Sequence, residues 1–90
     1  MVVEFHYIIY GKVRGVGFRY FAKETAMKFS ILGWIRNRQD GAVEGEASGE
    51  SGNIVEFFNT LSRGNFLSKV SSIETSSIEK KDFSNFEIKF

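Results

Sequence analysis

The sequence contains no cysteine, no proline and only one histidine among its 90 residues. Without cysteine the chain can form no disulfide framework, no thiolate nucleophile and no cysteine metal site. One histidine is too few for a two-histidine zinc site or a zinc-protease helix. Twelve Lys and Arg residues against eleven Asp and Glu leave a net charge of +1, so no global field attracts nucleic acid or an anionic membrane. Any attraction for an anion must be local.

Long hydrophobic runs are also missing. The most apolar N-terminal stretch, residues 5–10, is interrupted by His6 and has no basic flank or small-residue cleavage site beside it. A membrane-spanning helix would need about 20 apolar residues. We therefore expect a cytoplasmic domain that has neither a membrane nor a nucleic-acid partner.

What the chain does have is core-forming residues. Hydrophobic residues make up 42% of it, and ten residues are phenylalanine. A chain of this length buries roughly two-thirds of its unfolded surface around one core. No linker, repeat or low-complexity tract divides it, so residues 1–90 are expected to form a single domain.

Hydrophobic periodicity and turn residues predict a mixed order of strands and helices. The expected elements are strands at 3–10, 32–36 and 42–48, a helix at 18–29, a second helix capped by Ser51-Gly52-Asn53 and closed by Gly64, and strands at 70–78 and 86–90. This order predicts a ferredoxin-like β-α-β-β-α-β sandwich of the α/β (α+β) class, an antiparallel sheet of four to five strands with two helices on one face. Because this fold hosts many activities, function has to be inferred from a site.

One candidate site is the glycine-rich turn Gly11-Lys12-Val13-Arg14-Gly15-Val16-Gly17, which joins the first strand to the first helix. Glycines let successive N–H groups converge on one point, and the start of a helix carries unpaired donors and partial positive charge. Arg19, in the first helical turn, adds a planar cation that can bind two phosphate oxygens. Together they indicate a binding site for phosphate or carboxylate. A glycine-rich turn without a ligand, with Arg19 exposed to solvent, is an alternative that the same sequence allows.

A second interpretation is RNA binding. Residues 14–21, Arg-Gly-Val-Gly-Phe-Arg-Tyr-Phe, resemble a motif of RNA-recognition domains, which share this fold. That motif lies on a central strand, where its aromatic side chains stack on bases. Here the letters fall on a strand-to-helix turn, and Phe18 is expected to point into the core.

The chain resembles the acylphosphatase family. The family signature Gly-X-Val-Gln-Gly-Val-X-Phe-Arg matches Gly11-Lys12-Val13-Arg14-Gly15-Val16-Gly17-Phe18-Arg19. A second signature matches Gly33-Trp34-Ile35-Arg36-Asn37, then Gly41-Ala42-Val43, then Gly49, and the closing segment 84–90 is similar to the family's last strand. One residue departs from the pattern, because Arg14 stands where the family commonly has Gln. We expect Arg14 to point to solvent.

The resemblance implies an enzyme that hydrolyses acyl phosphates to a carboxylate and inorganic phosphate, without a metal or cofactor. It implies that Arg19 binds the phosphate and that Asn37 orients the attacking water. The predicted substrate-binding residues are Arg14, Gly15, Val16, Gly17, Phe18 and Arg19. It also implies that the last two strands form opposite edges of the sheet, with the glycine loop at the end of a central strand.

Other polar residues have simpler interpretations. We expect His6 to be structural, Glu44, Glu46 and Ser48 to face solvent, and the segment 80–82 to be a solvated turn. The sequence thus predicts a monomeric, cytoplasmic acylphosphatase that acts on a small-molecule acyl phosphate. The alternative is a non-catalytic anion- or RNA-binding ferredoxin-like module.

Overall fold

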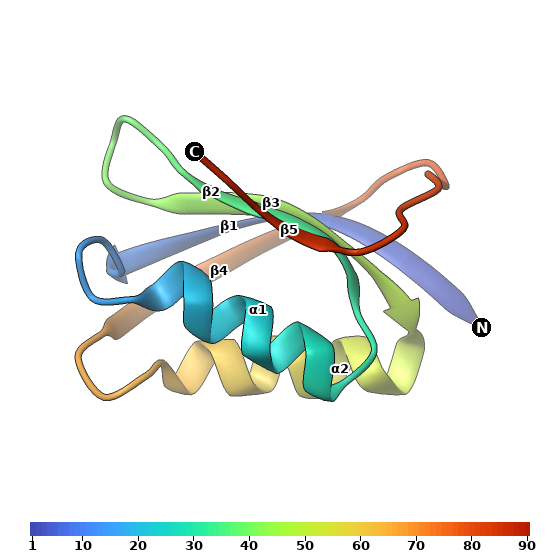
Figure 1. Ribbon diagram of the computed structural model, residues 1–90, viewed down its shortest axis with the longest axis horizontal. Coiled ribbons are helices and arrows are strands. Elements are labelled where there is room, and N and C mark those ends of the chain that lie inside the picture. The colour runs from blue at the N-terminus through green and yellow to red at the C-terminus, as the bar shows by residue number, and fades with distance from the viewer.

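Two helices lie side by side on one face of a five-stranded sheet in the computed structural model, which describes residues 1–90 (Figure 1). Neither helix is long and apolar enough to cross a membrane. The elements are β1 (Val2–Lys12), α1 (Phe18–Lys28), β2 (Leu32–Asn37), β3 (Val43–Glu50), α2 (Ser51–Arg63), β4 (Lys69–Ser77) and β5 (Phe86–Lys89).

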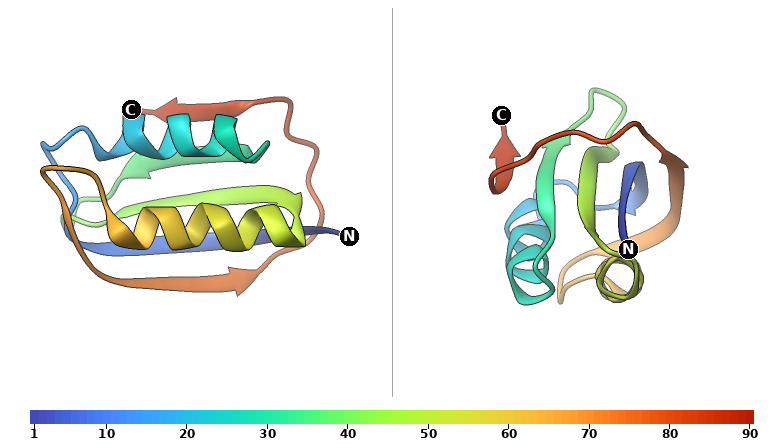
Figure 2. Two further views of the ribbon diagram at one scale, coloured as in Figure 1. Left: turned by 90° about the horizontal axis from the view of Figure 1, so that it is seen from below. Right: turned by 90° about the vertical axis from the view of Figure 1, so that its right-hand side faces the viewer.

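The strand order is β4-β1-β3-β2-β5, which confirms the ferredoxin-like arrangement and places the last two strands at opposite edges. Three of the neighbouring pairs are antiparallel, as expected, but β5 runs parallel to β2. The reason is the connection at 78–85, which crosses the sheet on the face away from the helices (Figure 2). It stays at the end where β4 finishes and β2 begins, so the next strand runs in the direction of β2.

The core lies between the helices and the sheet. Alternate residues of β1 point into it, so that Tyr7 and Ile9 are fully buried. On α2 the apolar face predicted either Phe57 or Phe58, and the structure buries Phe57 while Phe58 is half-buried. The Tyr7 and Phe57 rings meet edge-to-face with centroids 6.1 Å apart, a geometry that contributes about 0.5–1.5 kcal/mol beyond area burial.

The ends of α2 correct one expectation and confirm another. Ser51 is the first helical residue, Glu50 occupies the N-cap position, and no side chain caps the first turn. The predicted cap at Ser51-Gly52-Asn53 is therefore wrong, because the helix begins directly after β3. Gly64 does close the helix, with a positive φ of 74°.

Strand directions bring four segments to one end of the sheet. Strands β1, β2 and β5 finish there and β4 begins there. The first segment, residues 12–17 from the last residue of β1 to α1, we call the anion loop, and the second, residues 38–42 after β2, we call the hairpin loop. The other two are residues 64–68 before β4 and the C-terminal Phe90 (Figure 1). Of the two predicted catalytic residues, Asn37 directly precedes the hairpin loop and Arg19 lies two residues after the anion loop.

Candidate active site

The anion loop has backbone donors without partners. Gly15 and Gly17 both have φ of 73°, in the left-handed region that favours glycine. Gly17 is the N-cap of α1, and no side chain caps this helix. None of the N–H groups of residues 14–17 donates a hydrogen bond within the protein. The loop therefore presents free donors at a helix N-terminus, as an anion site requires.

Arg19 stands directly behind this loop, in the first turn of α1. Its guanidinium lies 4.7 Å from the centre of the Phe90 ring and donates one long hydrogen bond, 3.4 Å, from Nη1 to the Lys89 carbonyl. These contacts come from the C-terminal strand and orient the guanidinium. Its other N–H groups stay available for an oxyanion.

Asn37 is the last residue of β2 and pairs with Val43 of β3. Its side-chain Oδ1 is buried and accepts no hydrogen bond. A buried acceptor without a partner costs about 1–3 kcal/mol, so each one in a native protein calls for an explanation, such as a catalytic role or a bound water or ion. The strand pairing thus holds an unused acceptor at a fixed position.

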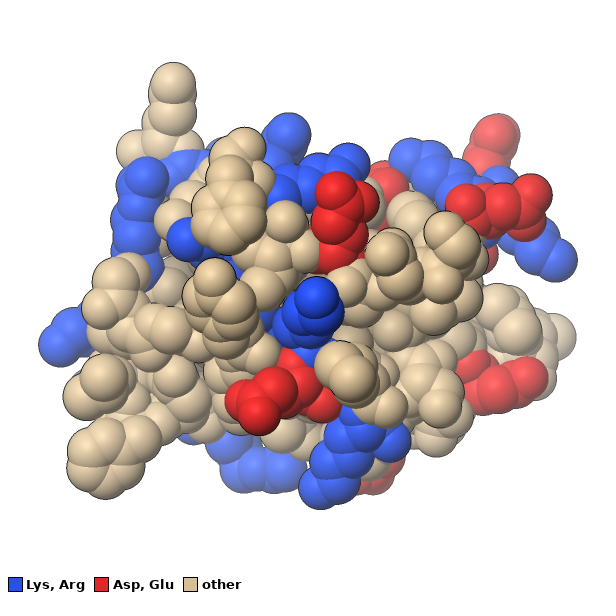
Figure 3. Space-filling model, viewed as in Figure 1, with Lys and Arg blue, Asp and Glu red and all other residues tan.

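One small cavity brings these groups together. It has a volume of about 140 Å³ and is lined by residues from β2, the anion loop and the start of α1: Val13, Gly15, Gly17, Phe18, Arg19, Tyr20 and Asn37. One face of this end of the molecule carries basic side chains. Figure 3 shows Lys and Arg but no acidic side chains at the left end of the face drawn, where the anion loop lies in Figure 1. The cavity suits a small anion.

A larger hollow of about 620 Å³ lies between α2 and β4. Seven of its thirteen lining residues are hydrophobic, and none is charged. It lacks the cation and the free donors that an anion needs, so the smaller cavity is the better candidate.

The sequence predicted that Arg14 points to solvent, but in the structure its guanidinium also has a partner within the protein. Although it is exposed, its Nη1 donates a 3.0 Å hydrogen bond to the carbonyl oxygen of Arg38 in the hairpin loop. Arg14 therefore connects the anion loop to the loop that begins directly after Asn37. The long side chain of arginine makes this reach possible.

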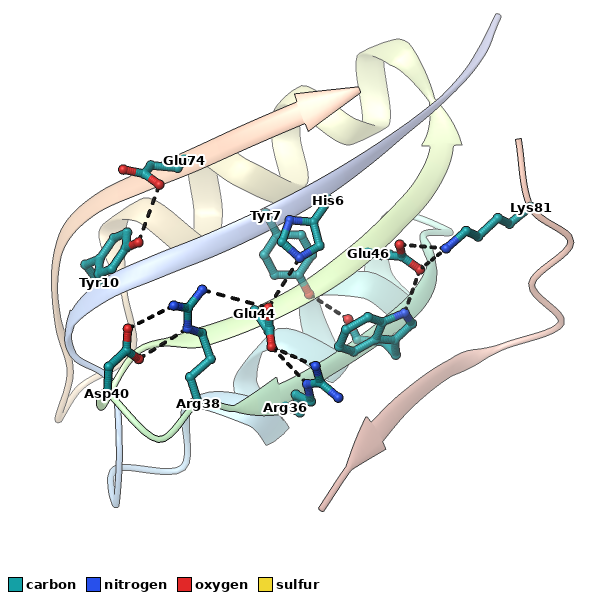
Figure 4. A network of polar contacts seen from close by, with 11 residues as sticks. His6, Tyr7, Tyr10, Arg36, Arg38, Asp40, Glu44, Glu46, Glu74 and Lys81 are labelled. Carbon is teal, nitrogen blue, oxygen red and sulfur yellow. Dashed lines mark hydrogen bonds and ion pairs between the residues drawn. The ribbon is translucent and has the colours of Figure 1, made fainter. Parts of the chain in front are cut away.

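The hairpin loop is closed by its own residues. The Arg38 N–H donates to the Ala42 carbonyl over 2.8 Å, and Asp40 accepts both the Ala42 N–H and the Arg38 guanidinium. Figure 4 shows Arg38 between Asp40 and Glu44. The Ala42 N–H and the Arg38 guanidinium lower the pKa of Asp40 from its ordinary 3.8. This closed turn fixes the end of β2 and therefore Asn37.

The open face of the sheet is less exposed than the sequence suggested. Glu46 and Ser48 are buried, because the segment 78–85 crosses over them. Lys81, expected in a solvated turn, instead places Nζ 2.8 Å from Glu46 Oε2. Burial raises the pKa of Glu46, but the hydrogen bonds from Lys81 and Trp34 outweigh that effect and lower it from its ordinary 4.5.

The remaining sequence candidates also have clear positions. His6 lies on the open face with Nε2 3.4 Å from Glu44 Oε2, and it does not line the cavity. Phe18 is only 1% exposed. The residues that resemble an RNA-recognition motif lie on the anion loop and α1, not on a strand. No group of three or more metal-ligating side chains occurs in the protein.

The sequence did not single out two residues beside the site. Phe90 reaches Arg19 only because β5 is placed beside β2. Asn65, 49 residues from the anion loop, donates from Nδ2 to the Val16 carbonyl over 2.8 Å. Asn65 follows the helix-ending Gly64, and nothing local in the sequence indicated a contact with so distant a segment.

Comparison with known proteins gives a consistent result. The family model described as Acylphosphatase matches residues 5–88. The chain is 42% identical to an acylphosphatase of Geobacillus thermodenitrificans over 86% of this chain and 79% of that protein, and 36% identical to one of Bacillus licheniformis over 99% and 100%. The crystal structure of acylphosphatase from Bacillus subtilis matches with a TM-score of 0.93 and 34% identity, and the match covers 100% of both chains.

Proposed function

The chain belongs to the acylphosphatase family and is an enzyme that hydrolyses acyl phosphates, and from this premise we propose how its residues divide the work. The anion loop and Arg19 bind the phosphoryl group. Asn37 orients the water that attacks phosphorus. The products are a carboxylate and inorganic phosphate.

The observation that carries this assignment is the unpaired Oδ1 of Asn37. It is buried in a protein whose other buried side-chain polar atoms all have partners, and Asn37 lines one cavity with Arg19, Gly15 and Gly17. An acceptor held opposite a cation and a set of free N–H donors can receive the O–H of a water while the donors hold an anion. This arrangement supports the roles proposed for Arg19 and Asn37.

The chemistry needs little more than these groups. The leaving carboxylate is the base of an acid with a pKa of about 4, so it departs without a general acid. Water oxygen forms a bond to phosphorus, the bond from phosphorus to the acyl oxygen breaks, and its electron pair leaves with the carboxylate. The transition state is loose, so positioning and charge stabilisation supply most of the catalysis. Donors that are already aimed at the phosphoryl oxygens provide both.

The water must also lose a proton. The Asn37 amide accepts a hydrogen bond but takes no proton near neutral pH. We propose that the proton passes to a phosphate oxygen of the substrate, since the second pKa of related phosphate esters is about 6. A pH–rate profile that required an enzymic group titrating near pH 7 would contradict this step.

We propose a supporting role for Arg14 as well. Its positive charge lies in the anion loop, and its hydrogen bond to the Arg38 carbonyl joins that loop to the segment after Asn37. The same side chain can therefore strengthen anion binding and fix the spacing of the two halves of the site. The glutamine common at this position in the family would carry no charge.

We also propose that the enzyme acts as a cytoplasmic monomer without a nucleic-acid partner. One chain supplies every group that lines the cavity. The substrate is a charged phosphate, which a lipid bilayer does not admit without a carrier. Size-exclusion chromatography with light scattering tests the monomer, and a second copy required for activity would contradict it.

The deciding experiment is hydrolysis of benzoyl phosphate by the wild type, Arg19→Ala and Asn37→Ala, with EDTA present and folding checked by circular dichroism. We expect wild-type activity, and losses in kcat/KM of about 10²–10³-fold or more for Arg19→Ala and about 10²-fold for Asn37→Ala. Folded variants with unchanged activity would overturn the roles of the two residues. A folded wild type that binds phosphate but hydrolyses nothing would favour the non-catalytic anion-binding alternative.

A further inference from the structure

We propose that Asn65 is a positioning residue that aims the Gly17 N–H into the anion cavity. This inference rests on the proposed function, because it gives Asn65 a part in binding the same phosphoryl group. Asn65 lies in the connection between α2 and β4, outside both sequence signatures, and it does not line the cavity.

The Asn65 side chain is fixed at both ends of its amide. Oδ1 accepts the Ser68 N–H over 3.0 Å, and Nδ2 donates to the Val16 carbonyl over 2.8 Å. The backbone of Asn65 is also tied, since its N–H donates to Ser68 Oγ over 2.8 Å. The side chain is half-buried, which limits competition from water. The amide nitrogen is therefore held in one place, facing the anion loop.

The bond to Val16 controls a donor on the other side of the same peptide unit. In a trans peptide the C=O and the following N–H point in opposite directions, and the protein has no cis peptide bond. When Asn65 holds the Val16 carbonyl on its own side, the Gly17 N–H must point away from Asn65. Gly17 lines the cavity, and its N–H has no partner within the protein.

The peptide between Val16 and Gly17 needs such a restraint. Glycine adopts positive and negative φ with similar ease, so the Gly17 backbone alone does not fix the direction of this peptide. No other side chain binds the Val16 carbonyl. Without Asn65 the peptide plane can rotate and turn the N–H away from the phosphate. Fixed donors stabilise a transition state better than mobile ones, because they need no reorganisation during the reaction.

The test compares two variants of Asn65 with one of its neighbour. Asn65→Asp keeps the acceptor for the Ser68 N–H but loses the donor to Val16, and it adds a negative charge. Asn65→Ala loses both bonds without adding charge. Ser68→Ala is the control, since it disturbs the same turn but leaves the Asn65 amide on Val16. What the two Asn65 variants share is the loss of the bond to the Val16 carbonyl.

Each protein is assayed with benzoyl phosphate for kcat and KM, and with inorganic phosphate by ¹⁵N–¹H NMR, following the Gly17 amide. We expect both Asn65 variants to lose about 10–100-fold in kcat/KM and to show a smaller shift of the Gly17 amide on phosphate binding. Ser68→Ala is expected to stay within about twofold of the wild type at comparable thermal stability.

Wild-type kinetics and phosphate affinity in both Asn65 variants would overturn the inference. An equal loss in all three variants would also overturn it, because the effect would then belong to the turn as a whole. If the wild type binds phosphate without hydrolysing substrate, the catalytic function fails, and the NMR titration alone decides the role of Asn65. If the wild type neither hydrolyses substrate nor binds phosphate, both proposals fail.

Discussion

The anion loop and the hairpin loop lie at the same end of the sheet and both contain glycine at positive φ, yet their backbone donors differ. In the hairpin loop the N–H groups of Arg38, Gly41 and Ala42 have acceptors within the loop, and only those of Gln39 and Asp40 have none. In the anion loop the N–H groups of residues 14–17 have none. The hairpin loop is closed by hydrogen bonds of its own, whereas the anion loop leaves four consecutive donors for a ligand.

This difference shows what a glycine-rich turn contributes to an active site. A turn that is closed by its own hydrogen bonds holds a neighbouring residue, and here the hairpin loop holds Asn37. A turn with unsatisfied donors depends on contacts with other segments for its shape. Here Asn65 donates to the Val16 carbonyl of the anion loop, and Arg14 of the loop donates to the Arg38 carbonyl. Asking where each backbone N–H and C=O of the anion loop finds its partner thus identifies both the free donors of the loop and Asn65 as the residue that positions one of them.

The largest expected effect tests whether the donors of the anion loop suffice without a planar cation. Arg19→Lys keeps the charge but replaces the guanidinium fork with a single ammonium. We expect kcat/KM for benzoyl phosphate to fall by about 10²-fold. Arg63→Lys, at the exposed end of α2, is the matched control and is expected to change activity less than twofold. Full activity of Arg19→Lys would mean that the loop N–H groups carry the site.

The next prediction compares the same substitution in the anion loop and in the hairpin loop. Gly15 and Gly41 have φ of 73° and 93°, and a Cβ added at either would meet no atom within 4 Å. Alanine at each position therefore causes backbone strain without a clash, about 1–2 kcal/mol of lost stability in both variants. We expect Gly15→Ala to lose about 10-fold in kcat/KM or more, because the neighbouring N–H groups move. We expect Gly41→Ala to retain activity within about twofold.

Urea unfolding and benzoyl phosphate kinetics check both quantities. Equal losses of activity in Gly15→Ala and Gly41→Ala would remove the distinction between the loops. Similar losses of stability with different activities would confirm it.

Local patterns predicted most of the fold. The change from alternating to helical spacing at Phe18 placed α1, and the clean alternation around Val43 and Ala47 identified the buried face of β3. The parallel pairing of β5 was not predicted, because it depends on the path of residues 78–85 across the open face. The burial of Glu46 has the same origin, since Lys81 lies 35 residues away along the chain.

The candidate site shows the same division. The anion loop and Arg19 lie close together in the sequence, so a local pattern was enough to predict them as a site. Asn37 was predicted from the second family signature. The contacts of Arg14 with Arg38 and of Asn65 with Val16 join segments 24 and 49 residues apart. Such contacts depend on how the four segments meet at one end of the sheet, which no local pattern encodes.

A smaller effect tests the bond that joins the two loops. Arg14→Ala removes both the hydrogen bond to the Arg38 carbonyl and one positive charge, whereas Arg14→Lys keeps the charge alone. We expect a rise of about 3–10-fold in KM for Arg14→Ala. If the tether matters more than the charge, Arg14→Lys behaves like Arg14→Ala, and if the charge matters more, it behaves like the wild type. Unchanged KM in both would restore the expectation that Arg14 is only solvated. Steady-state kinetics at low and high salt distinguish these results, because salt screens the charge.

The smallest effect concerns the hairpin loop alone. The Ala42 N–H and the Arg38 guanidinium lower the pKa of Asp40 in the folded protein from its ordinary value of 3.8. The charged carboxylate therefore stabilises the fold at any pH above 3.8, and this contribution is lost as the pH falls through the lower pKa of the folded state. Asp40→Asn is therefore expected to be less stable than the wild type near neutral pH, with the difference shrinking below about pH 4. Urea unfolding at several pH values measures it, and activity at neutral pH is expected to stay within about twofold, because Asp40 lies outside the cavity. If the difference between the two proteins did not change with pH, the carboxylate charge would not be what orders this turn. The closure of the hairpin loop would then rest on its backbone hydrogen bonds, and the contrast with the anion loop would be one of backbone donors alone.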